Sequence, residues 1–280
     1  MNAIEIKNLT KEYPGFRLGP LDLVLPSGCI LGLVGENGAG KSTTIKLILD
    51  MIRGNSGSVS ILGRDNGQDL HLTKEEIGVV LDEVGIPDCL DTAKVAKVMA
   101  GIYRNWDQKV YETYLEKLSI PRDKLFKDLS RGNKMKLGIA VALSHGAKLL
   151  ILDEATSGLD PVVRDEVVTL FHEFTRDPGH SVLISSHIVS DLEKLCDYIA
   201  FLHKGKLLLY EEKDVLIAEY CIIRGTSQQL SIVDPGAVIG SKLNAYGGEM
   251  LVKRSAIPAE MTYSPITIEE LFLFMIKEAK

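Results

Sequence analysis

The pattern of apolar and polar residues in the first third of the chain predicts β-strands. The two kinds alternate at residues 3–9 (AIEIKNL) and 21–25 (LDLVL), as expected for strands with one buried face. Residues 29–35 (CILGLVG) are almost continuously apolar, which is typical of a strand covered on both faces. A helix is expected after Gly40, because apolar residues then recur at helical spacing, namely at Ile45, Ile48, Leu49 and Ile52.

Two further strands, at residues 57–63 (GSVSILG) and 77–81 (IGVVL), precede a change to helical spacing. No strand is expected between about Thr92 and His145. The apolar stripes in this stretch are Val95, Val98, Met99 and Ile102, followed by Val110, Tyr114 and Leu118. The pattern therefore predicts an inserted α-helical subdomain at about residues 86–145.

Strands are expected again at residues 148–154 (KLLILDE) and 180–187 (HSVLISSH), with a helix from Pro161 to Arg176 between them. Residues 198–210 (YIAFLHKGKLLLY) predict a hairpin that turns at the Lys–Gly pair. This order of elements predicts an α/β fold with a mainly parallel sheet, an antiparallel β subdomain at the N-terminus and the helical insert.

The pattern weakens after about Glu219. Short strands are expected in YCIIRG, QLSIV and MLVKR, at residues 220–225, 229–233 and 250–254. Residues 267–279 predict an amphipathic helix that begins with Thr-x-x-Glu, with Ile268, Leu271, Phe272 and Met275 on one face. The chain is therefore expected to consist of a main domain at 1–218 and a small α+β C-terminal extension at 219–280.

Composition excludes several classes of protein. Of the 280 residues 45% are hydrophobic and 25% are charged, as in an ordinary soluble globular protein, and the net charge of −6 argues against nucleic-acid binding. The scattered cysteines (Cys29, Cys89, Cys196 and Cys221) are expected to be reduced, as in a cytosolic protein. The N-terminus lacks the apolar core of a signal peptide, and the apolar stretches are shorter than the roughly 20 residues that span a bilayer. Any work at a membrane is expected to be done from outside the lipid.

A phosphate-binding loop is the strongest chemical signal. Residues 35–43 (GENGAGKST) match G-x-x-x-x-G-K-[ST] between an expected strand and an expected helix. The glycines let the backbone amides point at a phosphate, Lys41 places a positive charge on the outer phosphates, and Ser42 offers a hydroxyl ligand to Mg²⁺. The nucleotide-binding residues expected here are Gly35, Glu36, Asn37, Gly38, Ala39, Gly40, Lys41, Ser42 and Thr43.

Three polar residues follow predicted core strands. Asp153 ends a buried strand and is expected to hold Mg²⁺, while Glu154 is placed to deprotonate a water that attacks the γ-phosphate. His187 also stands at the end of a strand, on the same edge as the phosphate loop if the sheet is parallel. We therefore expect Glu154, His187 and Lys41 to act in catalysis.

A second phosphate-seeking helix start lies at residues 129–135 (LSRGNKM), where Ser130 and Gly132 open an expected helix. Together with GENGAGKST, LLILDEATSGLD and LISSH, this stretch resembles the nucleotide-binding subunit of an ABC transporter, over about residues 1–218. The resemblance implies a P-loop NTPase core, ATP and Mg²⁺ as cofactors, and a head-to-tail pair of subunits. Ser130 and Gly132 would then cap the nucleotide of the partner subunit.

Two more residues are assigned by their positions in this family. Tyr13 resembles the aromatic residue that stacks on adenine, with an ordinary structural tyrosine as the alternative. Asp160 resembles the loop that communicates across the dimer, although capping of the helix that starts at Pro161 explains it as well, and both roles can coexist.

The sequence departs from the family pattern at two places. Arg131 and Asn133 replace a glycine and a glutamine of the usual L-S-G-G-Q, and Arg131 could face a partner's phosphate or simply solvent. Asp82, followed by Glu83, stands where a glutamine commonly contacts Mg²⁺ and the attacking water. Asp82 is therefore expected to bind Mg²⁺ and to take part in catalysis, although it places a like charge near ATP. Hydrolysis is therefore expected to persist, at a rate that these changes could reduce.

The resemblance implies an ATP-hydrolysing subunit, with exporter-type features in Arg131 and in the acidic loop at Asp82. Its expected place is cytoplasmic, peripheral on the inner face of the cell membrane. Its expected partners are a second ABC ATPase subunit, identical or paralogous, and separate integral membrane permease subunits that dock on the helical insert. No nucleic acid is expected. The alternatives are a non-transport ABC ATPase acting on nucleic acid or ribosomes, and an ATP-binding regulatory subunit with low hydrolysis.

Overall fold

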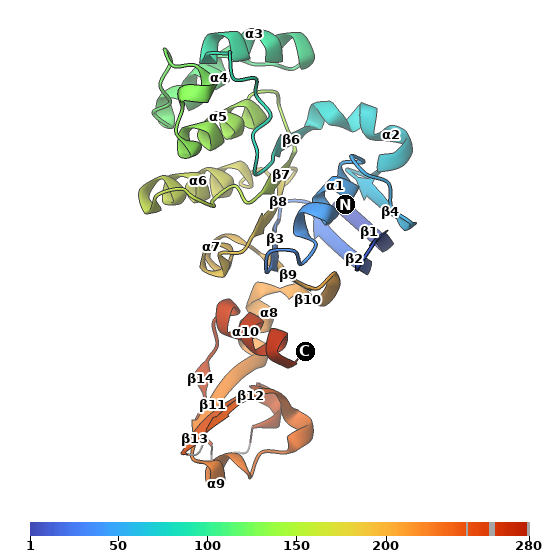
Figure 1. The fold of residues 1–280 in the computed structure, drawn as a ribbon, viewed down its shortest axis with the longest axis vertical. Coiled ribbons are helices and arrows are strands. Elements are labelled where there is room, and N and C mark those ends of the chain that lie inside the picture. Colours follow the sequence, from blue (N-terminus) through green and yellow to red (C-terminus); the bar gives the residue numbers. More distant parts are fainter. Residues whose placement is uncertain (245, 258–260, 279–280) are drawn as a thin grey trace.

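A six-stranded sheet runs through the centre of the computed structural model, which describes residues 1–244, 246–257 and 261–278 (Figure 1). Its parallel strands lie in the spatial order β9 (Tyr198–His203), β3 (Ile30–Gly35), β8 (Ser181–Ser186), β7 (Leu149–Asp153) and β6 (Ile77–Val80). The strand β10 (Lys206–Glu212) pairs antiparallel with β9, so the predicted hairpin is confirmed. Parallel pairing brings the carboxyl ends of β3, β7 and β8 to one edge of the sheet.

One face of the central sheet is covered by the phosphate-loop helix and by an antiparallel sheet. Leu31, Ile151 and Leu183 of the central strands are buried on this face, in one apolar core with Ile45 of the helix. The covering elements are α1 (Lys41–Ile48), β2 (Phe16–Pro26), β1 (Asn2–Tyr13), β4 (Ser56–Ile61) and β5 (Arg64–Asp65). The helix ends at Ile48 rather than continuing to Ile52, because the chain leaves helical geometry at Leu49.

Helices cover the opposite face, where Leu150, Leu152 and Ile184 are buried. Figure 1 shows α5, α6 and α7 on this side of the sheet, and α1 with the N-terminal strands on the other. The bounds are α5 (Arg131–Leu143), α6 (Pro161–Phe174) and α7 (Val189–Leu195). Burial on both faces explains why the central strands are continuously apolar in sequence. The predicted α/β fold with a mainly parallel sheet is confirmed.

The helical insert has an apolar core of its own, built by α3 (Thr92–Ile102), α4 (Gln108–Lys117) and the outer face of α5. The predicted stripe on α3 is partly wrong, because Val98 and Ile102 are 42% and 60% exposed while Val95 and Ala96 face the core. On α4 the buried positions are Tyr111 and Leu115. The apolar spacing correctly predicted helices here, but their packing against α5 determines which face of each helix is buried.

The C-terminal part forms a third sheet in the order β12 (Val238–Asn244), β13 (Gly247–Lys253), β11 (Tyr220–Gly225) and β14 (Ser264–Pro265). The strand predicted at residues 229–233 is wrong. A short helix, α9 (Ser227–Leu230), begins there because Thr226 and Gln229 form a capping box. The predicted amphipathic helix is confirmed as α10 (Ile268–Glu278), whose Thr267 and Glu270 cap each other reciprocally.

Helix α10 joins the C-terminal sheet to the main core. Ile268 and Leu271 are fully buried, and the Phe272 ring lies 5.1 Å from the Phe201 ring of the central sheet. The expected division between residues 218 and 219 falls in the last turn of α8 (Lys213–Glu219) and stays a prediction. The remaining helical elements are α2 (Asn66–Thr73) and the short 3₁₀ turns Lys74–Glu76, Phe126–Asp128, Pro235–Ala237 and Arg254–Ala256. Within the described ranges, no helix is long and apolar enough to cross a membrane.

Candidate nucleotide site

The loop between β3 and α1 is shaped by glycines at both of its ends. At Gly35 a Cβ atom would lie 2.6 Å from the Leu202 carbonyl oxygen, and at Gly40 it would lie 2.6 Å from Leu18. Gly40 also has a φ of +112°, in the region that favours glycine. Ala39 is buried beneath the loop, where its carbonyl accepts a hydrogen bond from the Gly205 amide. In the described structure no side chain caps α1, so its first amides face an anion site.

Lys41 is buried at the start of α1, with 5% exposure. Its Nζ donates hydrogen bonds to the carbonyl oxygens of Gly35 (2.7 Å) and Glu36 (3.3 Å). The same atom lies 3.3 Å from Oε1 of Glu154. The loop backbone thus fixes the ammonium group at the edge of the sheet, beside the Glu154 carboxylate that directly follows β7.

Glu154 is held between two positively charged or polar side chains. Its Oε2 lies 2.7 Å from His187 Nδ1, and its backbone N–H donates to Ser185 at 3.1 Å. Its φ of +53° is uncommon for a residue other than glycine, asparagine or aspartate. Such strained positions gather at functional sites, where the surrounding contacts enforce them. The parallel strands therefore bring Glu154 and His187 together as the sequence predicts.

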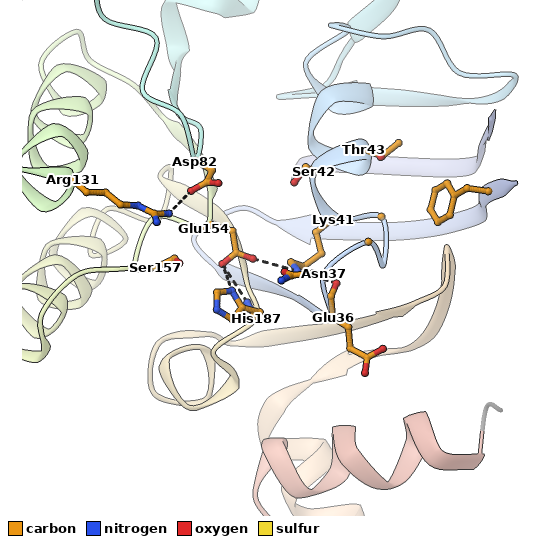
Figure 2. Close-up of a pocket in the computed structure, with 13 residues that line it drawn as sticks. Glu36, Asn37, Lys41, Ser42, Thr43, Asp82, Arg131, Glu154, Ser157 and His187 are labelled. Carbon is orange, nitrogen blue, oxygen red and sulfur yellow. Dashed lines mark hydrogen bonds and ion pairs between the residues drawn. The ribbon is translucent and has the colours of Figure 1, made fainter. Parts of the chain in front are cut away.

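These residues surround a cavity of about 620 Å³ (Figure 2). In the described structure its lining contains ten residues predicted for the site: Glu36, Asn37, Gly38, Gly40, Lys41, Ser42, Thr43, Asp82, Glu154 and His187. Phe16, Arg131 and Ser157 complete the lining. Figure 2 shows the phosphate loop on one side of the cavity, and Asp82 with Arg131 on the other. A space of this size, with amides and a lysine at one side, suits a nucleoside triphosphate.

Oxygen donors for Mg²⁺ are present at the same edge. Ser42 and Asp82 line the cavity, and the buried Asp153 carboxylate accepts a hydrogen bond from Ser185 Oγ. In the described part of the chain, no three His, Cys, Asp or Glu side chains form a metal-binding group. Mg²⁺ at nucleotide sites needs only one or two protein ligands besides phosphate and water. The hydroxyl and carboxylates present here therefore fit Mg²⁺.

The aromatic residue nearest the cavity differs from the one expected. Among the described residues, the cavity lining includes Phe16 but not Tyr13, which is 42% exposed with its ring 5.2 Å from Lys11 Nζ. Tyr13 and Phe16 face each other across the turn between β1 and β2. This pair of aromatics flanking Pro14–Gly15 was a signal that Phe16 was an equal candidate. The role of Tyr13 at adenine stays a prediction.

Residues 129–135 (LSRGNKM), here called the signature stretch, form the start of α5. Ser130 caps the helix by accepting a hydrogen bond from the Asn133 amide at 3.3 Å, and its side chain is exposed. Neither Ser130 nor Gly132 belongs to the described lining of the chain's own cavity. Arg131 does, and its Nη2 lies 2.7 Å from Asp82 Oδ1. The sequence left Arg131 between a phosphate contact and solvent, and missed this third arrangement.

Asp160 caps α6. Its Oδ1 accepts hydrogen bonds from the amides of Val162 and Val163, each at 3.1 Å. Asp160 therefore caps the helix, as one of the two interpretations of the sequence expected. Its role across a dimer stays a prediction, and both roles are compatible. Ser157, four residues after Asp153, was not singled out in sequence because it lies in no strand or helix.

Comparisons with known proteins agree with this geometry. Residues 18–157 match the protein family described as ABC transporter. The chain is 33% identical to the bacitracin transport ATP-binding protein BcrA of Enterococcus faecalis, over 74% of this chain and 68% of that protein. It is 36% identical to the lantibiotic transport ATP-binding protein SrtF of Streptococcus pyogenes, over 75% and 91% of the two chains.

A solved structure described as an ATP binding subunit of an ABC transporter superposes with a TM-score of 0.70 and 26% identity, over 76% of this chain and 91% of the other. The matched family segment contains the phosphate loop, the N-terminal turn of α5 and the end of β7, which build most of the cavity, whereas Phe16 and His187 lie outside it. The chain therefore belongs to the ABC transporter family, as an ATP-binding subunit.

Proposed function

We propose that this subunit hydrolyses ATP to ADP and phosphate, with Glu154 as the general base. The observation that carries the proposal is the position of the Glu154 carboxylate between Lys41 and His187, inside the cavity of the phosphate loop. The lysine charge belongs on the outer phosphates, so the carboxylate beside it stands next to the γ-phosphate. A water held there would be oriented by Glu154 and would lose its proton to it.

Mg²⁺ bound with the nucleotide would supply positive charge to the β- and γ-phosphate oxygens. Ser42 and Asp153 are the residues proposed to hold it, with Asp82 as the third candidate at the opposite wall of the cavity. His187 donates its Nδ1 hydrogen to Glu154 and so keeps the carboxylate turned toward the cavity. Lys41 is held by carbonyl oxygens until phosphate oxygens replace them.

The active form we propose is a head-to-tail pair. Ser130 and Gly132 lie at the exposed N-terminus of α5 and outside the described lining of their own cavity. A serine hydroxyl and free amides at a helix N-terminus bind phosphate well. In the pair, each such helix end would close over the γ-phosphate bound by the other subunit, and Asp160 would lie near the shared interface.

We infer that separate membrane permease subunits receive the motion of this pair, with the helical insert at residues 86–145 as their docking surface. The relatives in Enterococcus faecalis and Streptococcus pyogenes, named for bacitracin and lantibiotic transport, support a role in transport. Export is the direction we propose, based on Arg131 and Asp82. The subunit would lie on the cytoplasmic side of the membrane, bound to those permeases.

The dependence of ATP hydrolysis on protein concentration tests the proposal. With Mg²⁺ and saturating ATP, the rate per subunit should rise with concentration and level off where sedimentation shows a dimer. EDTA should abolish the rate at every concentration. Full turnover by material that sedimentation shows to be monomeric would contradict the shared site, and no turnover with or without detergent-solubilised permease would contradict the assignment of hydrolysis.

A further inference from the structure

The Arg131 side chain connects two parts of the molecule that the proposed function assigns to different nucleotides. Arg131 is the first residue of α5, between Ser130 and Gly132. Its guanidinium nevertheless reaches back into the chain's own cavity, where Nη2 lies 2.7 Å from Asp82 Oδ1 (Figure 2). These two residues are 49 positions apart in sequence, so only the folded structure brings them together.

The loop between β7 and α6 lies against the other flank of this side chain, which is 58% exposed. A Cβ atom at Gly158 would lie 3.3 to 3.4 Å from Nε, Cδ and Cζ of Arg131. Gly158 also has a φ of +72°, which favours glycine in its own right. The loop that follows Glu154 therefore leaves room for the guanidinium, and Arg131 lies between this loop and Asp82.

Charge gives the contact a consequence for nucleotide binding. A lone carboxylate at Asp82 would repel a triphosphate in the same cavity. Arginine stays protonated at every physiological pH, so Arg131 compensates the Asp82 charge whenever the two are in contact. From the sequence, the Asp82 charge was expected to oppose ATP binding. This effect is therefore expected only when Arg131 is not in contact with Asp82.

We propose that Arg131 is a positioning residue that couples the two nucleotide sites of the pair. In the open subunit it holds and neutralises Asp82 at the chain's own site. When the α5 N-terminus closes on the partner's nucleotide, Arg131 moves with Ser130 and Gly132, because adjacent Cα atoms stay 3.8 Å apart. Asp82 is then released toward its own nucleotide. The coupling rests on the proposed head-to-tail pair, whereas the neutralisation of Asp82 does not.

The first test uses the monomer and ADP, with EDTA present so that no metal contributes. Calorimetry on Arg131→Gln should show ADP affinity reduced about two- to fivefold, the size expected for an exposed ion pair. Adding Asp82→Asn to that variant should restore the affinity, whereas Asp82→Asn alone should not weaken it, because it leaves the Arg131 charge in the cavity. Lys134→Gln is the matched control, because it removes a positive charge from the same turn of α5, where Lys134 Nζ lies over the Phe126 ring, 4.9 Å from the ring centroid, and its ADP affinity should be unchanged.

The second test uses ATP-bound dimers of Glu154→Gln, measured by sedimentation at saturating ATP. Asp82→Asn should tighten the dimer about two- to fivefold, because no ion pair has to break on closure. In a protein that also carries Arg131→Gln, Asp82→Asn should leave the affinity of the dimer unchanged. In a protein that also carries Lys134→Gln, Asp82→Asn should still tighten the dimer.

Either series can overturn the inference. An Arg131→Gln variant that binds ADP normally, or whose loss Asp82→Asn does not restore, removes the neutralising role. If Asp82→Asn changes the affinity of the dimer equally in the presence of Arg131 and in the Arg131→Gln variant, the proposed coupling is wrong. If the Glu154→Gln parent forms no dimer with ATP, the proposed pair fails, while the ADP series still decides for or against Arg131 as the partner of Asp82.

Discussion

His187 Nδ1 lies 2.7 Å from Glu154 Oε2, although the two residues follow different strands and stand 33 positions apart. An ionised carboxylate can only accept hydrogen bonds, so the imidazole must donate from Nδ1. The other carboxylate oxygen, Oε1, lies 3.3 Å from Lys41 Nζ. Glu154 is thus oriented from both sides, and the neighbouring order of β7 and β8 in the sheet is what makes this possible.

Replacing the base separates binding from hydrolysis. Glu154→Gln keeps the shape of the side chain but cannot take a proton, so the rate of ATP hydrolysis should fall about 10²–10⁴-fold. ATP should still bind and should stabilise the dimer. A phosphate-release assay and sedimentation measure the two effects, with Glu116→Gln at an exposed position of α4 as the control. Turnover close to that of the natural protein would show that the base is another residue.

Removing the orienting imidazole should act through Glu154. His187→Ala is expected to lower kcat about 10–100-fold, the range for losing a hydrogen bond to a charged group. The KM for ATP should change little, because His187 contacts the base and not the phosphate loop. His172→Ala, which removes an exposed histidine from α6, serves as the control. A change in KM with unchanged kcat would assign His187 to nucleotide binding instead.

The buried lysine is expected to contribute to affinity. Lys41→Ala removes the ammonium group that the loop carbonyls hold in place, and ADP binding should weaken about 10–100-fold. Lys46→Ala, at the exposed side of the same helix, should bind ADP normally. Calorimetry with both variants makes the comparison. Equal affinity of the two variants would rule out the cavity as the phosphate site.

Local signals made the phosphate loop and the carboxyl ends of the strands predictable. Gly38 and Gly40 have φ values of +81° and +112°, which favour glycine, and a Cβ atom at Gly35 would lie 2.6 Å from the Leu202 carbonyl oxygen, so the motif marks the positions where this loop requires glycine. Asp153 ends a strand whose apolar run is unmistakable, and the parallel pairing of this strand with β8 places Glu154, the next residue, beside His187. The sequence was sufficient to predict those parts of the site whose signal lies in a short run of neighbouring residues.

Contacts between distant segments were not predictable in this way. The pairing of Arg131 with Asp82 depends on how α5 packs against the central sheet, and neither residue has a sequence signal for the other. At residues 229–233 the apolar spacing favoured a strand, but the Thr226–Gln229 capping box starts a helix and leaves Ile232 67% exposed. Val98 and Ile102 show the same limit, because an apolar residue faces solvent when no element packs over it.

A buried hydroxyl in the helical insert should contribute to stability. Tyr111 is fully buried, and its hydroxyl donates to the Thr92 carbonyl oxygen at 3.0 Å. Burial also raises the pKa of this phenol, so it stays a donor at every pH used for folding studies. Tyr111→Phe should lower the free energy of unfolding by about 1 kcal/mol. Urea unfolding measures the loss, and Tyr246→Phe, at a 92% exposed site, should show none.

Acid should destabilise the protein through His145. This histidine is fully buried, stacks on Tyr103 with ring centroids 3.9 Å apart, and donates from Nδ1 to the Glu75 carbonyl oxygen at 3.0 Å. In the described structure its Nε2 has no hydrogen-bond partner, so a proton there would have no acceptor. Burial accordingly lowers the pKa of His145 below its ordinary value.

The direction of the pH effect follows from this lowered pKa. The unfolded chain binds a proton at His145 at a higher pH than the folded chain does, so the free energy of unfolding falls as the pH drops below about 6.5. His145→Phe cannot titrate, and the stability difference between the natural protein and this variant should therefore shrink between pH 7.5 and pH 5.5. Urea unfolding at both pH values measures this difference. A difference for His145→Phe that does not change with pH would mean that this imidazole becomes protonated as easily inside the fold as in the unfolded chain.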